Sequence, residues 1–416
     1  MEQNKHIPGT YYIEKAMTAF LFAVTLSAAL YAFIYMPGYN KYEISDWMIN
    51  YQGGFVRRGL MGELLFMFEK MKPYNLRYAI TTINLFFYIL FFFTVFNIFR
   101  KHRLSLIGAM FPVACVATSI AGYRRDFMML CLCCLVFHCF FKYLKEKRKL
   151  LLAVSVVLMS LSIIVYEPVF FVLVPLLMLQ YWKACSENKT LKTALIFIIP
   201  IACMALSCIC SGNQEQAQAI WQSWLPYITP YGYNQANGIG PAVGFLGLDT
   251  SYVIDFHLGF NLGDNILLNI ITIVIVFALA FYLCTHIPQI DRNSKTIACN
   301  EYKNELARIL VFQLLVQLPM FTVLSTDYGR TIPMSLYTTL FLFHFARRDS
   351  VNIYVTRPVE KLSKDIMSLF SRLPFINNTY FYILIVLVFP FQIFVPSLLG
   401  DNIMVHLFEK VSKYLF

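Results

Sequence analysis

The stretch Asp46–Glu63 combines the side chains that phosphate binding and proton transfer require, in a chain that is otherwise largely hydrophobic. Arg57 and Arg58 are adjacent, planar and permanently charged, and such guanidinium groups match the oxygens of a phosphate. Asp46 could accept a proton as a general base, and Glu63 is the second carboxylate able to do so. The pattern predicts a site for a phosphate-bearing molecule.

Two glycines and a short helix are expected to shape this site. Gly53 and Gly54 allow the backbone to turn tightly and to come close to a ligand. A short amphipathic helix is predicted from about Phe55, and its free N–H groups would favour an anion. Its apolar residues with helical spacing are Leu60, Met61, Leu64, Leu65 and Phe68. Alternatively, Arg57 and Arg58 only anchor this helix at lipid headgroups.

Further charged residues lie at the ends of other hydrophobic segments. They are Arg124, Arg125, Asp126, Glu167, Asp327 and Arg330. All are predicted on the same side of the membrane as Asp46, so a helical bundle could bring them together in one cavity at the membrane boundary. For Asp327 and Arg330, which are about one helical turn apart, local pairing is the alternative.

The segment 211–265 contains no lysine or arginine and is rich in glutamine, asparagine, glycine and aromatic residues. Its notable aromatic residues are Trp221, Trp224, Tyr227, Tyr231 and Tyr233. Flat rings beside amide side chains suit the binding of a sugar, whose C–H faces stack on the rings. An aromatic belt at the membrane surface is the alternative.

The composition determines the class of protein. Of 416 residues, 58% are hydrophobic and only 14% are charged, whereas soluble proteins have about 25% charged residues. We therefore predict an all-α polytopic membrane protein, with residues 1–416 forming one integral-membrane domain. The net charge of +11 fits the cytoplasmic loops of a protein of the bacterial inner membrane, and it does not indicate nucleic-acid binding.

Hydrophobic segments and basic clusters predict about eleven transmembrane helices, with the N-terminus in the cytoplasm and the C-terminus outside. The expected outer loops include a first loop, 37–77, and a large loop, 211–265. The basic segment 349–376 is expected inside, with an amphipathic surface helix. The predicted spans cover about 16–36, 78–99, 104–122, 127–143, 150–165, 169–182, 193–210, 266–286, 309–325, 331–346 and 379–399.

Neither metal nor cofactor chemistry is predicted. Cys131, Cys133, Cys134 and Cys139 lie in one hydrophobic segment without the paired spacing of a zinc site. His138 is isolated there and is expected to be an ordinary helix-interior residue. No carboxylate lies clearly within a predicted span, which argues against an ion-coupled transporter or flippase.

Five short motifs resemble those of integral-membrane proteins of bacterial O-antigen and capsule synthesis. Within that group, they are most similar to the serotype-converting O-antigen glucosyltransferases. The motifs are Asp46-Trp47, the run 53–60, Arg124-Arg125-Asp126, Tyr166-Glu167-Pro168 and Asp327-Tyr328-Gly329-Arg330. The paired Asp-Glu found in many such enzymes in the first outer loop is absent, which leaves the choice between Asp46 and Glu63 open.

The resemblance implies a GT-C-like glycosyltransferase that acts at the periplasmic face. Its donor would be undecaprenyl phosphate-glucose, and its acceptor an O-antigen repeat on its lipid carrier. Asp46 or Glu63 would deprotonate the acceptor, and Gly53, Gly54, Asp126, Glu167 and Asp327 would support the site. The arginines that would hold the donor phosphate are Arg57, Arg58, Arg124, Arg125 and Arg330. An O-antigen polymerase, which would use similar arginines without Asp46 as a base, is the main alternative.

Overall fold

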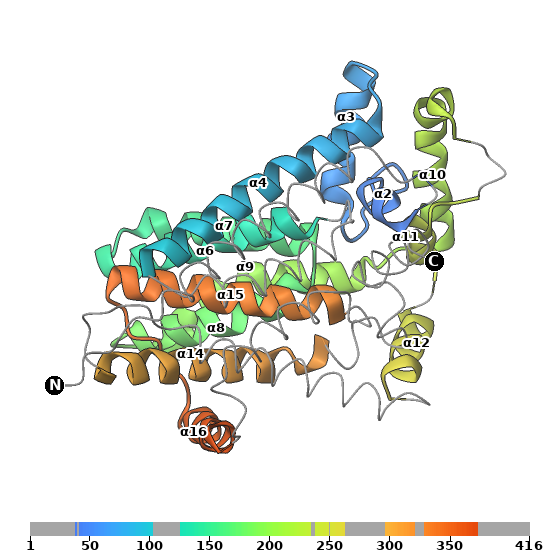
Figure 1. Cartoon of the computed structure of the whole chain (residues 1–416). Coiled ribbons are helices and arrows are strands. Elements are labelled where there is room, and N and C mark those ends of the chain that lie inside the picture. Colours follow the sequence, from blue (N-terminus) through green and yellow to red (C-terminus); the bar gives the residue numbers. More distant parts are fainter. Residues whose placement is uncertain are drawn as a thin grey trace, which may run out of the picture.

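The computed structural model describes residues 38–39, 41–102, 125–233, 238–248, 250–262, 296–320 and 328–372. Within these ranges the secondary structure is helical and contains no strand (Figure 1). Five predicted segments therefore lie outside the described residues: the spans at 16–36, 104–122, 266–286 and 379–399, and the C-terminal tail.

Among the described residues, three helices are long and apolar enough to cross a membrane, namely Leu76–Ile98 within α4 (Leu76–His102), α6 (Asp126–Glu146) and α9 (Lys189–Ile209). Two shorter apolar helices, α7 (Lys149–Val165) and α8 (Val169–Ala184), pack with α6 and α9. Helices α7 and α8 meet at a tight turn whose Pro168 is unsuited to the interior of a helix. These five helices agree with five predicted spans to within a few residues.

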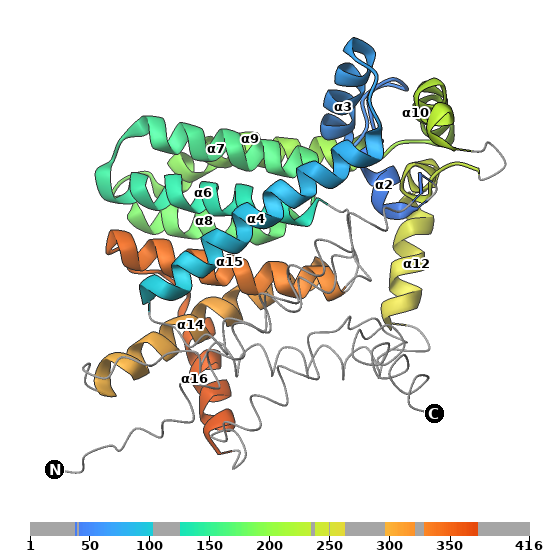
Figure 2. The same ribbon diagram turned by 45° about the horizontal axis from the view of Figure 1, so that its top comes forward.

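Two later helices complete the described bundle, α14 (Thr296–Val316) and α15 (Tyr328–Asp349). Helix α15 packs against α6 and α14, and the long helices run side by side in both views (Figures 1 and 2). Helix α14 begins about thirteen residues before the predicted span at 309, because its first half is polar but still favours helix.

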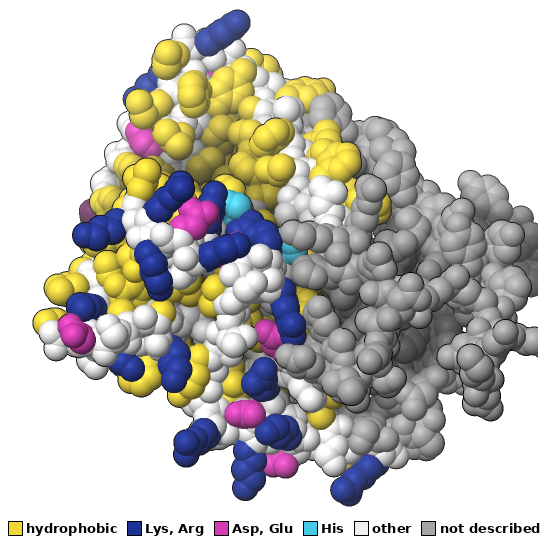
Figure 3. Space-filling view, turned by 90° about the vertical axis from the view of Figure 1, so that its left-hand side faces the viewer, with side chains coloured by type: hydrophobic (Ala, Val, Ile, Leu, Met, Phe, Trp, Pro, Cys, Tyr) yellow, Lys and Arg dark blue, Asp and Glu magenta, His cyan; other side chains and the backbone are white. Residues whose placement is uncertain are grey.

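Lysine and arginine side chains gather at one end of the bundle, which we call the basic end (Figure 3). The turn between α6 and α7 lies there and exposes Lys145, Lys147, Arg148 and Lys149. Helix α16 (Arg357–Ser371) follows α15 and lies across the bundle (Figures 1 and 2). Its sequence is strongly amphipathic, as predicted for the segment 349–376.

The opposite end of the bundle carries the short helices (Figure 1). Those that precede α4 are α2 (Tyr42–Trp47) and α3 (Gly59–Met71). The segment 211–265 forms α10 (Gln214–Ile228), η1 (Thr229–Tyr231), α11 (Pro241–Gly244), η3 (Phe245–Gly247) and α12 (Thr250–Leu262). Helix α10 starts where the side chain of Asn213 accepts a hydrogen bond from the N–H of Gln216 at 2.9 Å. A segment expected to be one loop is thus largely helical.

Candidate functional site: a buried charge cluster at the opposite end

Four segments meet at this end and bring five charged residues together. Asp46 comes from α2, Arg57 and Arg58 from the loop before α3, Arg125 from the residue before α6, and Glu167 from the α7–α8 turn. We call these five residues the charge cluster. The convergence that the sequence predicted is therefore observed for these five residues.

Glu167 and Asp46 each contact arginines. The Nε of Arg58 donates to Oε2 of Glu167 at 2.7 Å, and Nε of Arg57 lies 3.8 Å from Oε1 of the same carboxylate. Oδ2 of Asp46 lies 3.2 Å from Nε of Arg125, and its Oδ1 lies 4.0 Å from Nη1 of Arg58. Arg58 thus bridges the two carboxylates, and the cluster has one positive charge in excess.

Arg125 is the most deeply buried member, with 1% of its side chain exposed. Its Nη1 donates to the backbone carbonyls of Arg58 at 2.9 Å and of Val165 at 3.2 Å. The guanidinium therefore ties the loop before α3 to the end of α7. Asp46, with 5% of its side chain exposed, lies almost as deep, whereas Arg57 and Arg58 are 28% and 22% exposed. The cluster thus has a buried floor and an accessible rim.

Several polar atoms on the floor have no hydrogen-bond partner. They are Nε and Nη2 of Arg125 and Oε1 of Glu167, although Nε of Arg125 is close to Asp46. Buried polar groups are usually hydrogen-bonded, and charged ones are costly when they are not. Since Nε of Arg125 is paired with Asp46, Nη2 is its unmet donor, and an unmet buried donor beside an excess of positive charge is suited to binding an anion.

The pKa values of the three arginines follow from burial and from the neighbouring carboxylates. Burial lowers the pKa of Arg57, and Glu167 opposes that effect. Burial also lowers the pKa of Arg125, with Asp46 in opposition. For Arg58 burial acts in the same direction, but Glu167 and the other anionic neighbours outweigh it and raise the pKa. Because a guanidinium loses its proton only far above neutral pH, all three stay charged.

Two aromatic rings, Trp47 and Tyr166, contact the cluster. The sequence motifs include both residues but predicted no role for either. The guanidinium of Arg58 lies 5.0 Å from the ring centroid of Tyr166, and that of Arg125 lies 5.5 Å from that of Trp47. Such stacking orients a planar guanidinium. In the sequence, only their position linked them to the cluster, since Trp47 directly follows Asp46 and Tyr166 directly precedes Glu167.

Glu63, the alternative base, binds the loop instead. One of its carboxylate oxygens accepts from the N–H of Tyr51 at 2.8 Å, and Nε2 of Gln52 donates to both at 3.0 and 3.2 Å. These contacts fix residues 51–52 against α3. Of the two carboxylates in Asp46–Glu63, only Asp46 contacts the arginines of the cluster.

The helix and the glycine pair differ from the sequence predictions. Helix α3 begins at Gly59 rather than near Phe55, because Arg58 adopts a left-handed conformation with φ 62° that ends the loop. A side chain on Gly53 would meet the backbone oxygen of Gln216 at 2.8 Å, so this glycine faces α10 rather than a ligand. Gly54 has φ +106°, a conformation that side chains disfavour, and it makes the turn as predicted.

The aromatic residues of the segment 211–265 mostly form a core. Trp224 is fully buried and donates to the carbonyl of Met48 at 2.7 Å; Trp221 is 3% exposed and donates to the hydroxyl of Tyr233 at 3.2 Å. Tyr233 is itself only 6% exposed. The expected sugar platform on these three rings is therefore wrong for this structure, since their faces are covered. Tyr227 is half-buried, and Tyr231 is exposed.

The remaining predicted residues are only partly described. Asp126 is the first residue of α6 and is half-buried. Arg124 and Asp327 lie outside the described residues, and Arg330 lies in α15 with its side chain outside them. In the part of the chain that the structure describes, no group of three or more histidine, cysteine, aspartate or glutamate residues could hold a metal ion.

The fold and the buried cluster define a helical membrane protein with a polar site at one end of its bundle. Residues 12–259 match the family described as uncharacterised membrane protein Rv1490, so the chain belongs to that family of membrane proteins. The matched region contains all five cluster residues. The family's description gives a membrane location and no activity. No curated protein and no solved structure matches the chain.

Proposed function

We propose that the protein is a polyprenyl-phosphate-sugar-dependent glycosyltransferase of GT-C-like architecture with about eleven transmembrane helices. Its reaction would move glucose from undecaprenyl phosphate-glucose to a lipid-linked O-antigen repeat. The observation that carries the proposal is the charge cluster, where Asp46 lies beside Arg58 and Arg125 and the three arginines outnumber the two carboxylates. The choice of glucose and O-antigen rests on the sequence resemblance alone.

The donor phosphate would enter at the rim of the cluster. Arg57 and Arg58 are the more exposed arginines, and both contact Glu167, while Arg58 also lies 4.0 Å from Asp46. A phosphate with two charged oxygens can compete for these guanidiniums, which offer several N–H donors each. Arg125 would add positive charge from below.

The lipid tail of the donor has an apolar surface close to those arginines. Helix α3 starts directly after Arg58 and exposes four large apolar side chains at helical spacing. They are Leu64, Met67, Phe68 and Met71, with exposed fractions of 42–78%. A prenyl chain lying along this stripe would leave its phosphate at the start of α3, beside Arg57 and Arg58.

Asp46 would act as the general base. Its carboxylate accepts the proton of an acceptor hydroxyl while the hydroxyl oxygen forms a bond to the anomeric carbon of the donor sugar. The bond from that carbon to the phosphate oxygen breaks, and its electron pair leaves with the phosphate. Arg57 and Arg58 stabilise the charge that grows on the leaving phosphate. One displacement of this kind inverts the anomeric centre.

The basic end supports a proposed membrane orientation. Short cytoplasmic loops carry the excess of lysine and arginine, so the basic end would lie in the cytoplasm and the cluster at the periplasmic face of the inner membrane. In a cysteine-free background, cysteine at exposed Gln222 of α10 should react with an impermeant thiol reagent in intact spheroplasts. Cysteine at exposed Lys361 of α16 should react only after lysis, and the reverse pattern would invert the orientation.

The activity itself can be tested with the purified full-length protein in liposomes. Undecaprenyl phosphate-glucose and a lipid-linked O-antigen repeat should yield a glucosylated repeat and free undecaprenyl phosphate. The Asp46→Asn variant is the matched control, because it keeps the size of the side chain but is a poor proton acceptor. Joining of two repeats without transfer of glucose would show a polymerase instead, and absence of either product would refute the proposal.

A further inference from the structure

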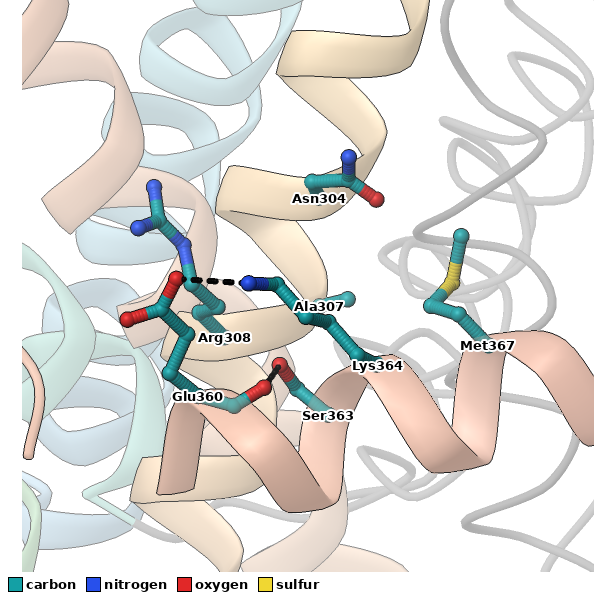
Figure 4. A pocket seen from close by; sticks show the side chains of 7 residues that line it. All are labelled: Asn304, Ala307, Arg308, Glu360, Ser363, Lys364 and Met367. Carbon is teal, nitrogen blue, oxygen red and sulfur yellow. Dashed lines mark hydrogen bonds and ion pairs between the residues drawn. The ribbon is translucent and has the colours of Figure 1, made fainter. Parts of the chain in front are cut away.

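A polar pocket lies far from the cluster in sequence, between α14 and α16 (Figure 4). It has a volume of about 200 Å³. Figure 4 shows that α14 contributes one wall and α16 the other. Its lining residues are Asn304, Ala307, Arg308, Glu360, Ser363, Lys364 and Met367.

The charges in this pocket favour an anion. Arg308 and Lys364 are positive, and Glu360 is the only acidic residue in the lining. Nζ of Lys364 lies 3.0 Å from Oε1 of Glu360, so one positive charge is already paired. Nε of Arg308 is buried and has no hydrogen-bond partner. Arg308 therefore offers an unmet donor next to a pocket large enough for a phosphate group.

Helix α16 also has the surface of a helix that lies at a membrane boundary. Val359 and Ser363 are buried against the bundle, while Leu362 and Leu369 are 40% and 61% exposed. The segment before the helix is attached to α8, since Nε2 of Gln180 donates to the carbonyl of Tyr354 and its Oε1 accepts from the N–H, both at 2.8 Å. An amphipathic helix fixed across a transmembrane bundle, with exposed leucines beside charged residues, is typical of an interfacial helix.

We propose that the α14–α16 pocket binds the headgroup phosphate of an anionic membrane lipid. The phosphate contacts Arg308 and Lys364, with Asn304 as a neutral partner, while the acyl chains continue into the bilayer beside α16. Two features favour a lipid as the occupant. The positive charge matches an anionic headgroup, and the exposed leucines place the helix next to acyl chains. This site is separate from the proposed transfer reaction.

Native mass spectrometry of the full-length protein tests this site. The protein is incubated with phosphatidylglycerol, with phosphatidylcholine or with inorganic phosphate, and the bound fraction is measured for each. Wild type should retain phosphatidylglycerol in preference to phosphatidylcholine. The double variant Arg308→Gln, Lys364→Gln should bind it more weakly by about fivefold for each charge removed, since one basic residue near an anionic surface contributes about 1 kcal/mol.

Lys361→Gln is the control, because Lys361 is exposed on the same helix and does not line the pocket. It should retain wild-type binding. Lys364→Gln alone provides a second variant if the double variant does not fold, since Lys364 is exposed and its loss leaves no buried charge. Equal lipid binding in wild type and pocket variants, or equal effects of Lys361→Gln and Lys364→Gln, would overturn the proposal. Retention of inorganic phosphate without any preference for phosphatidylglycerol would do so as well.

Discussion

The two ends of the bundle both carry arginines and carboxylates, but they pair them differently. At the basic end Arg347 contacts Glu305, and Arg348 contacts Asp349, which also lies 3.8 Å from Nζ of Lys145. Arg347 and Arg348 thus each contact a carboxylate. In the charge cluster three arginines share two carboxylates, and Arg125 keeps an unmet donor at 1% exposure.

The difference indicates which end is built for a ligand. Partly exposed ion pairs such as Lys145–Asp349 contribute little to stability and cost little to maintain. A buried excess of charge is expensive, and replacing it with apolar residues often stabilises a protein. The cluster is therefore an inefficient way to stabilise the fold. A role in binding and catalysis accounts for it better, so we place the proposed reaction at that end.

The largest effect is expected for Asp46→Asn, which should lower the rate of glucose transfer by about 10²–10⁴-fold, the usual contribution of a general base. The variant should leave the chain-length ladder of the O-antigen intact. Because it also removes the carboxylate beside buried Arg125, its level in the membrane is measured together with the rate. Glu63→Gln is the matched control, since an amide oxygen can still accept from the N–H of Tyr51. Near-normal transfer by Asp46→Asn, with loss in Glu63→Gln, would move the base to Glu63.

The next largest expected difference between the two ends is in how much each charged residue contributes to stability. Arg125→Gln removes the partner of a buried carboxylate and the donor to two backbone carbonyls. The free energy of unfolding should fall by about 3–5 kcal/mol. Lys145→Gln at the basic end should cost at most about 1 kcal/mol, because Asp349 keeps Arg348. Denaturant titration in detergent would measure both, and equal losses would contradict the contrast between the ends.

Sequence alone predicted the bundle well and the site in part. Basic clusters and apolar lengths located α6, α7 and α9, because these signals are local. The position of the charged motifs at the ends of hydrophobic segments predicted that Asp46 and Arg125 lie in one site. It did not show that Glu63 binds Tyr51 or that Trp224 binds the carbonyl of Met48, since these contacts depend on how distant segments pack.

A smaller effect should distinguish phosphate binding from membrane anchoring at the rim of the cluster. Arg58→Lys keeps the charge but loses the planar fork and the stacking on Tyr166. The KM for the lipid donor should rise about 10- to 150-fold, since a hydrogen bond to a charged group contributes about 1.5–3 kcal/mol. Arg348→Lys at the basic end should leave KM unchanged. Unchanged KM in both Arg57→Lys and Arg58→Lys would make these residues membrane anchors.

The smallest effect concerns the loop that carries both rim arginines. Gly54 has φ +106°, so Gly54→Ala forces an alanine into a conformation that costs about 1–2 kcal/mol. The added carbon also meets the side-chain nitrogen of Gln216 at 3.2 Å, and the end of that side chain would have to shift. We expect a loss of stability of that size and a rise in KM for the donor.

Gly244→Ala is the control for Gly54→Ala. Gly244 lies in α11, at the same end of the bundle, and its added carbon meets nothing closer than 4.0 Å. Alanine there should be neutral or slightly stabilising, because it restricts the unfolded chain. If Gly54→Ala lowers stability without changing KM, the loop positions no donor-binding residue, and the phosphate must be held by arginines on other segments, with Arg125 the first to test.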